Sequence, residues 1–315
     1  MLVLDFINEA GETYASARGV NATILKGSVQ EITLLNNTLL KLSGKSEKET
    51  DTFAELFSSY FKADTNITFD FSDADLTNIT SMRYMFNYCY GLKHVKFGSN
   101  NLSALTTFEG FIANSSALLD VDMSKVTALN CTNTNAMFSG CYAVTSIKLP
   151  TFGNLLTDIG SMFKECNNLT NIEKLNFNVD NVTNTSYMFD SCTSLTELNL
   201  NNYELLNNTT TLRMFRSCHN LVSIFCPFDW KTNKITDSTD MFRGCEALVG
   251  NNQNWIDLSS AWTIDFANPT TGYFKTSLKE GKPLYLGNTK IDTIKLKDTK
   301  ILTVYLGTNK LFESK

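Results

Sequence analysis

The side chains that could support catalysis or hold a metal ion are few and widely spaced. The chain has two histidines, His94 and His219, which lie in different copies of the repeat described below and are too far apart to act together. Asp70, Asp73 and Asp75 form a short acidic run, but it lacks the glycine and the distal glutamate of an EF-hand calcium loop. We therefore favour a solvated polar segment at the start of the first repeat over a calcium site.

Paired carboxylates offer no better case for an enzyme. Asp120 and Asp122 are two residues apart on an expected strand, so both side chains point to the same outward face, and a solvated surface is favoured over acid–base catalysis. The sequence also has no glycine-rich loop of the kind that cradles phosphates. We therefore predict a non-enzymatic protein with no metal and no cofactor.

Cysteine usage indicates buried thiols. Six of the eight cysteines occupy one slot of the repeat, and only Cys131 and Cys226 fall outside it. Equivalent side chains in stacked repeats point the same way, into the core, which favours free thiols over a disulfide framework. No CxxC pair is present, so a zinc site is disfavoured as well.

The elements that would position all these residues come from a repeat of 25 to 27 residues, exemplified by MFDSCTSLTELNL at 188–200. Seven copies occur, of which the second is degenerate, with Phe111 in the phenylalanine slot and Asn114 in the cysteine slot. Such a period is typical of a solenoid, in which each copy buries its apolar residues against its neighbours. The predicted core ladder consists of Phe86, Cys89, Phe138, Cys141, Phe163, Cys166, Phe189, Cys192, Phe215, Cys218, Phe242 and Cys245.

Each copy has two halves. The Phe and Cys of M-F-x-x-C are three apart, so one helical turn places them on one face, whereas L-x-x-L-x-L ends in the alternation of a half-buried strand. Residues that flank the middle apolar position of the strand face outward, and this pattern fits a binding face or plain solvation. We predict a binding face, because solenoids usually bind along their extended sheet. Its residues are His94, Lys96, Asp120, Asp122, Lys148, Lys174, Asn176, Glu197, Asn199 and Phe225.

The pattern MFxxCxxLxxLxL, preceded by a segment like Asn-Val-Thr, resembles the BspA-like branch of leucine-rich repeats. The resemblance covers residues 69–274, about two thirds of the chain. It implies a solenoid of about 26 residues per repeat with a short strand on one face, and a role in adhesion or other binding.

The segment before the repeats, residues 1–63, is predicted to contain short strands joined by glycine turns and then a helix over 49–63. This helix is expected to cap a solenoid over 64–274, because an open solenoid needs a seal at its end; a separate assembly module is the alternative. The apolar stripe of the helix would be formed by Phe53, Leu56, Phe57, Tyr60 and Phe61.

Aromatic residues mark the other end of the solenoid. They are expected to form the C-terminal seal, with a carbohydrate-binding platform as the alternative. These residues are Trp255, Trp262, Phe266 and Tyr273.

The last segment, 275–315, carries a different repeat of ten residues: PLYLGNTKI, TIKLKDTKI and TVYLGTNKL. Apolar alternation around short polar turns predicts tight β-hairpins. A sheet this small has exposed edges and is expected to pair with a second copy of the chain, with the solenoid or with a partner. Its YLG-x-T-K-[IV] pattern resembles repeats at the ends of tailed-phage structural proteins, which implies a place in a virion.

Charge and hydropathy narrow the possible partners. Lys and Arg number 27 against 32 Asp and Glu, with no concentrated basic block, so binding to nucleic acid through phosphates is excluded. No apolar run approaches the ~20 residues that span a bilayer, and the first residues, MLVLDFINEAG, lack the basic start of a Sec signal peptide.

These observations predict a displayed binding and assembly protein. The preferred hypothesis is a phage virion component in a tail, fibre or capsid, with other virion proteins or a host-surface protein or glycan as partners. The alternative is a cell-surface adhesin of an anaerobic bacterium or a protist, exported without a Sec signal.

Overall fold

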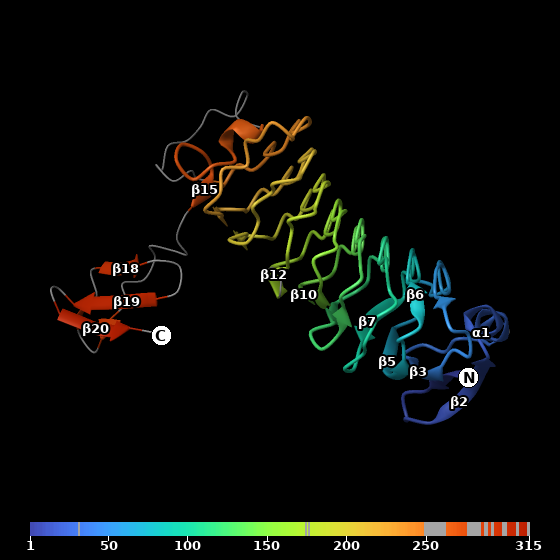
Figure 1. Ribbon diagram of the computed structural model, residues 1–315. Coiled ribbons are helices and arrows are strands. Elements are labelled where there is room, and N and C mark those ends of the chain that lie inside the picture. Colours follow the sequence, from blue (N-terminus) through green and yellow to red (C-terminus); the bar gives the residue numbers. More distant parts are fainter. Residues whose placement is uncertain are drawn as a thin grey trace. The chain divides into compact units, whose positions relative to one another are not determined.

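The structure is a computed structural model that describes residues 1–30, 32–173, 175, 177–248 and 263–275, together with the strand backbones 285–286, 289–290, 293–297, 301–306 and 309–313. The chain divides into two compact units, Met1–Thr276 and Ser277–Lys315. The first unit is a solenoid of about 26 residues per repeat (Figure 1). We call each repeat of this solenoid a rung.

One sheet runs through the N-terminal segment and the first rungs. Its strands are β1 (Leu2–Ile7), β2 (Thr13–Gly19), β3 (Leu39–Lys45), β5 (Ile67–Asp75), β7 (Leu92–Lys96), β8 (Asp120–Asp122), β10 (Ser146–Lys148) and β12 (Asn171–Glu173). Their order across the sheet is β12-β10-β8-β7-β5-β3-β1-β2. Neighbours are parallel from β3 to β12, while β1 runs antiparallel to β2 and β3. The N-terminal strands thus continue the sheet of the repeats.

The N-terminal segment also contains helix α1 (Ala22–Val29), where the sequence indicated only short strands. The helix begins after Asn21, whose side-chain oxygen accepts a hydrogen bond from Ile24 N at 3.2 Å. Lys26 Nζ donates to the carbonyl of Glu55 at 2.9 Å, which ties the helix to the start of the solenoid. Its buried face consists of Ala22, Leu25 and Val29.

The M-F-x-x-C half of each rung is a series of tight turns. Cys141 N donates to Phe138 O at 3.2 Å within the rung, whereas Phe138 N donates to Met162 O in the next rung at 2.9 Å. This alternation places two residues per rung in the left-handed region, here Ala136 (φ 54°) and Gly140 (φ 73°). Left-handed backbone is unfavourable for residues other than glycine, and the hydrogen bonds between rungs offset that strain.

A further rung precedes the seven predicted copies, and the predicted helix over 49–63 is wrong. Glu55 (φ 57°) and Ser59 (φ 59°) repeat the left-handed positions four residues apart, and Phe57 N donates to Met85 O at 2.9 Å. The ring of Phe57 stacks on Phe86 with centroids 5.8 Å apart. Apolar residues three to four apart suit both an amphipathic helix and these turns, which explains the error.

The second copy is less degenerate than its sequence indicates, because its predicted register is off by one residue. Ser115 Oγ donates to the carbonyl of Phe86 at 2.6 Å, as the thiols of other rungs do to the rung before them. Ser115 therefore holds the cysteine slot, where the sequence placed Asn114. Ile112 holds the phenylalanine slot and Phe111 the methionine slot. The intervals from Phe86 to Ile112 and from Ile112 to position 138 are then both 26 residues.

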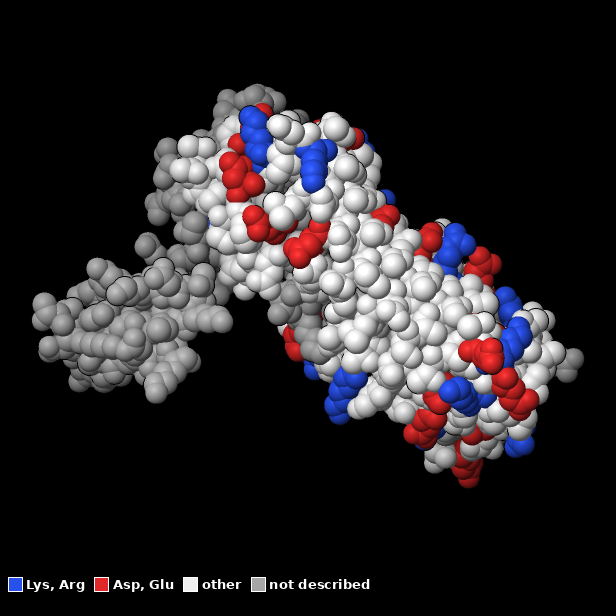
Figure 2. Space-filling view, viewed as in Figure 1, with Lys and Arg blue, Asp and Glu red and all other residues white. Residues whose placement is uncertain are grey.

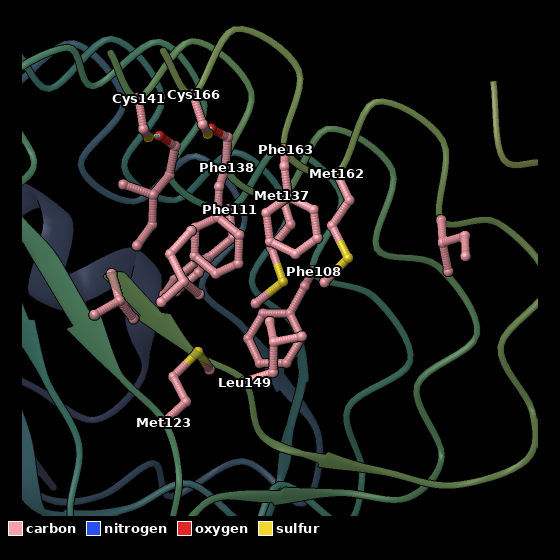
Figure 3. Packing of buried hydrophobic residues seen from close by; sticks show 14 of the residues in the cluster. Phe108, Phe111, Met123, Met137, Phe138, Cys141, Leu149, Met162, Phe163 and Cys166 are labelled. Carbon is pink, nitrogen blue, oxygen red and sulfur yellow. Dashed lines mark hydrogen bonds between the residues drawn. The ribbon is translucent and has the colours of Figure 1, made fainter. Parts of the chain in front are cut away.

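The phenylalanines and cysteines form the continuous core ladder that the sequence predicts (Figure 3). The ring of Phe189 lies between Phe163 and Phe215, with centroid distances of 5.6 and 5.7 Å. Cys192 Sγ donates to Phe163 O at 3.0 Å. All eight cysteines are free and buried, as predicted. Burial raises the pKa of a thiol, to about 12 in Cys141.

The polar segments that lead from the strand of one rung to the M-F-x-x-C turns of the next are held in place by a column of threonines. Each Oγ1 donates to a carbonyl of the preceding rung, as Thr209 does to Thr183 at 3.0 Å. The next residue is Ser, Thr, Asn or Asp, and its side chain closes a turn, as Asn184 Oδ1 does by accepting from Ser186 N at 2.9 Å. Short strands here are β4 (Asp51–Thr52), β6 (Ile79–Ser81), β9 (Thr127–Ala128) and β11 (Thr151–Phe152). The column consists of Thr80, Thr106, Thr132, Thr157, Thr183, Thr209 and Thr236.

A three-stranded parallel sheet lies near the C-terminal end of the solenoid. It contains β13 (Glu197–Asn199), β14 (Ser223–Phe225) and β15 (Phe274–Lys275), and a single 3₁₀ turn, η1 (Ile264–Phe266), precedes β15. The rings of Tyr273 and Phe242 are 4.9 Å apart. Tyr273 therefore packs against the last rung, where the sequence predicts a seal. Trp255 and Trp262 lie outside the described residues.

The second unit contains antiparallel strands, as the ten-residue repeat predicts. Strands β16 (Tyr285–Leu286) and β17 (Thr289–Lys290) form one pair. Strands β18 (Thr293–Lys297), β19 (Ile301–Leu306) and β20 (Asn309–Glu313) form a three-stranded meander.

Candidate ligand-binding face

The outward side of the eight-stranded sheet brings together half of the predicted binding residues. On β7, β8 and β10 the middle apolar residues Val95, Val121 and Ile147 are buried, and their neighbours point to the opposite side. Those neighbours include five predicted residues: His94, Lys96, Asp120, Asp122 and Lys148.

One column of this face alternates in charge from strand to strand. Opposite charges at facing positions on adjacent strands attract each other, so the four acidic and three basic members largely neutralise one another. The column is hidden in the sequence because its first two members belong to strands outside the repeat. In the order β1, β3, β5, β7, β8, β10 and β12, it consists of Asp5, Lys41, Asp70, Lys96, Asp122, Lys148 and Glu173.

Several of these charges form ion pairs. Lys148 Nζ lies 3.1 Å from Asp122 Oδ2 and 4.0 Å from Glu173 Oε1. The hydrogen bond with Asp122 raises the pKa of Lys148. Partial burial would raise the pKa of Asp122, but hydrogen bonds from Ser124 and Lys148 outweigh it and lower that pKa. These side chains are exposed, so the pairs contribute little to stability and act mainly to order the face.

A hollow of about 360 Å³ opens on this face beside His94. His94 Nδ1 lies 2.8 Å from Asp120 Oδ2, which fixes the orientation of the ring. The volume suits a small ligand or one unit of a larger one. The lining residues are Asn37, Asn66, Thr68, Lys93, His94 and Leu119.

Most of the hollow was not predictable as a site. Asn37 and Asn66 come from the connections before β3 and β5, outside the repeat motif, and no local pattern marks them. Asn37 has a φ of 56°, a conformation that asparagine tolerates better than most residues. Asn66 Nδ2 donates to Asn37 Oδ1 at 2.9 Å, so the two loops are joined at the rim.

The three predicted residues nearest the C-terminus do not join the face of the eight-stranded sheet. Phe225 is only 2% exposed and so does not face solvent. Its strand β14 is the middle strand of the three-stranded sheet, where Lys275 Nζ on β15 reaches Ser223 Oγ at 2.9 Å. Glu197 and Asn199 are exposed on β13 but belong to this three-stranded sheet.

The rung that contains Phe163 also differs from the prediction. Lys174 and Asn176 lie outside the described residues. The register of β12 pairs Asn171 with Ser146 and Glu173 with Lys148, so Asn171 and Glu173 occupy the outward positions.

The acidic run at the start of the solenoid does not converge on one point. Asp73 Oδ2 lies 2.6 Å from Lys41 Nζ, and Asp75 Oδ2 lies 3.1 Å from Lys45 Nζ. Asp73 and Asp75 are therefore paired with different cations, and Asp70 accepts a hydrogen bond from Ser72 N at 2.8 Å. Within the described ranges, no three His, Cys, Asp or Glu side chains are arranged to hold a metal ion.

Charge on the visible surface is mixed rather than concentrated. Figure 2 shows acidic and basic side chains next to each other towards both ends of the described solenoid, with a broad area between them that carries few. A partner that docks on that central area would meet mainly uncharged groups.

Comparison with known proteins gives one family. A family profile with the description "Mycoplasma protein of unknown function, DUF285" matches residues 53–148 and 151–255. A search of curated proteins found no match. Among solved structures, the chain is similar to a leucine-rich repeat protein from Bacteroides ovatus ATCC 8483, with 17% identity and a TM-score of 0.26 over 72% of this chain. The similarity spans 66% of that protein, slightly less than two thirds of its length.

A search of the described helices for a membrane span gave none: no helix among them has the length and apolar character to cross a bilayer.

Proposed function

We propose that this chain, which belongs to the family described as "Mycoplasma protein of unknown function, DUF285" and is built of BspA-like leucine-rich repeats, is a non-enzymatic binding protein. Its ligand occupies the outward face of the eight-stranded sheet. The observation that carries this proposal is the hollow of about 360 Å³ beside His94, which combines side chains from the repeat with two loops outside it.

The hollow is held in shape before a ligand arrives. Thr68 and His94 stand on paired strands of the sheet, the His94 ring is fixed by Asp120, and Asn66 is bonded to Asn37. A site that is ordered in advance loses less conformational entropy on binding, so more of the contact energy appears as affinity.

Replacing His94 with alanine should weaken binding of the full chain to its target surface by about tenfold, the effect of losing one well-placed contact. Fluorescently labelled protein would be measured by flow cytometry on a panel of intact bacterial and epithelial cells. His219→Ala is the matched control, because it removes the other histidine, which lies in a rung outside this face. Equal binding by both variants and by the unaltered chain would contradict the proposal.

The place of display is a finer part of the proposal, with two candidates. The ten-residue repeats of 275–315 resemble those of tailed-phage proteins and support a virion component that is attached, or paired with a second copy, through this segment. The description of the family as a Mycoplasma protein supports the alternative, an adhesin on a cell surface. In both cases the solenoid is the part that binds, to a host-surface protein or glycan.

A further inference from the structure

Three exposed tyrosines form a cluster that nothing above uses. Tyr88, Tyr90 and Tyr142 are 44%, 44% and 46% exposed, and we call them the tyrosine shelf. The rings of Tyr88 and Tyr90 have centroids 6.1 Å apart and meet at 62°. Tyrosine combines a large apolar face with a polar tip, and grouped exposed aromatics mark interaction sites.

The shelf has the periodicity of the solenoid. Tyr90 and Tyr142 occupy equivalent positions, each directly after the cysteine slot, and the rung between them has the small Ser116 in that position. Two rungs separate the tyrosines by about 10 Å. Tyr142 Oη donates to Glu165 Oε2 at 3.1 Å, which restrains the ring. The rings of Tyr90 and Tyr142 therefore lie on either side of a rung that has no aromatic side chain at this position. The distance between them is about the length of a disaccharide.

The shelf adjoins the hollow on the sheet face. Tyr90 precedes Lys93 by three residues in the same rung, a distance of at most about 10 Å along the chain. Leu119 continues this surface, because it lines the hollow and its amide donates to Lys93 O at 2.8 Å. Aromatic faces and a polar hollow thus lie within reach of one oligomeric ligand.

The polar groups of the hollow suit hydroxyl groups. Among the described residues, Asn66 Oδ1, Thr68 Oγ1 and Lys93 Nζ have no hydrogen-bond partner, so acceptors and donors are free for a ligand. Leu119 is the single apolar side chain of the lining. Asp120 accompanies His94, so among the described lining residues Lys93 is the single cation without an acidic partner, and the sulfated and sialylated glycans of the test below show whether it selects an anionic sugar.

We propose that the tyrosine shelf and the hollow together bind a neutral, linear glycan. Sugar rings pack their C–H faces on Tyr90 and Tyr142, and the hydroxyl groups of the next sugar bond to Asn66, Thr68 and Lys93. This inference rests on the proposed binding function and adds the chemical class of the ligand.

The test uses the full chain and two neutral tetrasaccharides, cellotetraose and chitotetraose, together with an array of neutral, sialylated and sulfated glycans. Tyr142→Ala and Asn66→Ala should each weaken binding of a neutral oligosaccharide at least tenfold by isothermal titration calorimetry. Tyr142→Phe keeps the ring and should stay within threefold. Tyr187→Ala, a tyrosine outside the shelf, is the control. Thermal unfolding of each variant verifies the fold.

Two results would overturn the inference. The first is that no neutral glycan on the array or in the calorimeter binds, or that one binds with an affinity unchanged by Tyr142→Ala. The second is that cell binding survives both periodate oxidation of the cell-surface sugars and digestion of the cells with cellulase and chitinase, and is still lost in His94→Ala. That second result would identify a protein ligand and leave the proposed binding function intact.

Discussion

Replacing Phe189 with alanine should lower the free energy of unfolding by about 3–5 kcal/mol, the usual cost of removing a buried phenylalanine. Its ring is completely buried between Phe163 and Phe215 and is parallel to the latter within 2°. In a solenoid each rung is stabilised by its neighbours. A cavity in the middle of the ladder therefore weakens two interfaces between rungs at once.

Urea unfolding followed by circular dichroism measures this loss. Phe189→Leu should cost no more than about 1.5 kcal/mol, because Ile112 shows that an aliphatic side chain fits the phenylalanine slot. Leu206→Ala, at a side chain that is 49% exposed, should change stability by less than about 0.5 kcal/mol. A loss below about 1 kcal/mol in Phe189→Ala would show that the ladder is not the main source of stability.

Raising the pH above about 9 should unfold the protein steeply. Burial raises the pKa of the thiols, to about 12 in Cys89, Cys131, Cys141, Cys226 and Cys245, and well above the ordinary thiol value in Cys166, Cys192 and Cys218. Below pH ~9 thiols are protonated in both states, so their stabilising contribution is fully present. At higher pH the unfolded chain loses these protons while the folded chain keeps them, and stability falls until the folded pKa is passed.

The rate at which the free energy of unfolding falls with pH follows from the number of thiols. Each thiol that ionises only in the unfolded chain contributes about 1.4 kcal/mol per pH unit, and eight of them contribute about 11 kcal/mol per pH unit. A typical domain has only about 5–15 kcal/mol of net stability. We therefore expect unfolding within one to two pH units above pH ~9, measured by urea titrations at pH 8, 9 and 10 with a reducing agent present.

A variant with Cys192→Ser and Cys218→Ser isolates the thiol contribution. Ser115 already fills this slot and keeps the hydrogen bond to the preceding rung, so the substitution suits the site. Serine does not titrate in this range, and the slope should fall by about 3 kcal/mol per pH unit, while the Tyr and Lys contributions are common to both proteins. An unchanged slope would mean that the thiols ionise within the folded chain.

The architecture was largely predictable because it follows from residue types at fixed intervals. Only stacking of copies can bury Phe189, Cys192 and their equivalents, so the period alone indicates a solenoid with a phenylalanine and cysteine ladder. The match to the family profile over 53–148 and 151–255 confirms the BspA-like repeats.

Errors arose where one spacing is compatible with two backbones or two registers. The run around Phe57 has the spacing of an amphipathic helix, but hydrogen bonds to the next rung make it a turn of the solenoid. Residue type alone aligns Phe111 with the phenylalanines of the other copies, whereas the hydrogen bond of Ser115 gives the true register. Neither choice can be made from the apolar pattern alone, because both alternatives bury the same side chains.

The candidate site was predicted only in part. His94 and Asp120 follow from strand alternation. The rest of the hollow depends on how β3 pairs with β5 and on where Asn37 and Asn66 meet. These are contacts between segments about 30 residues apart, and a single sequence carries no signal for them. The alternating charge column is hidden for the same reason, since Asp5 and Lys41 join it through strand pairing.

The central claim is that this chain is a displayed binding protein, and quantitative mass spectrometry of the source culture tests it most directly. Purified phage particles, a protease-shaved cell-surface fraction and the cell interior would be compared. We predict stoichiometric copies in the particles or, for an adhesin, enrichment among the shaved surface peptides. Confinement of the chain to the cell interior would contradict the claim.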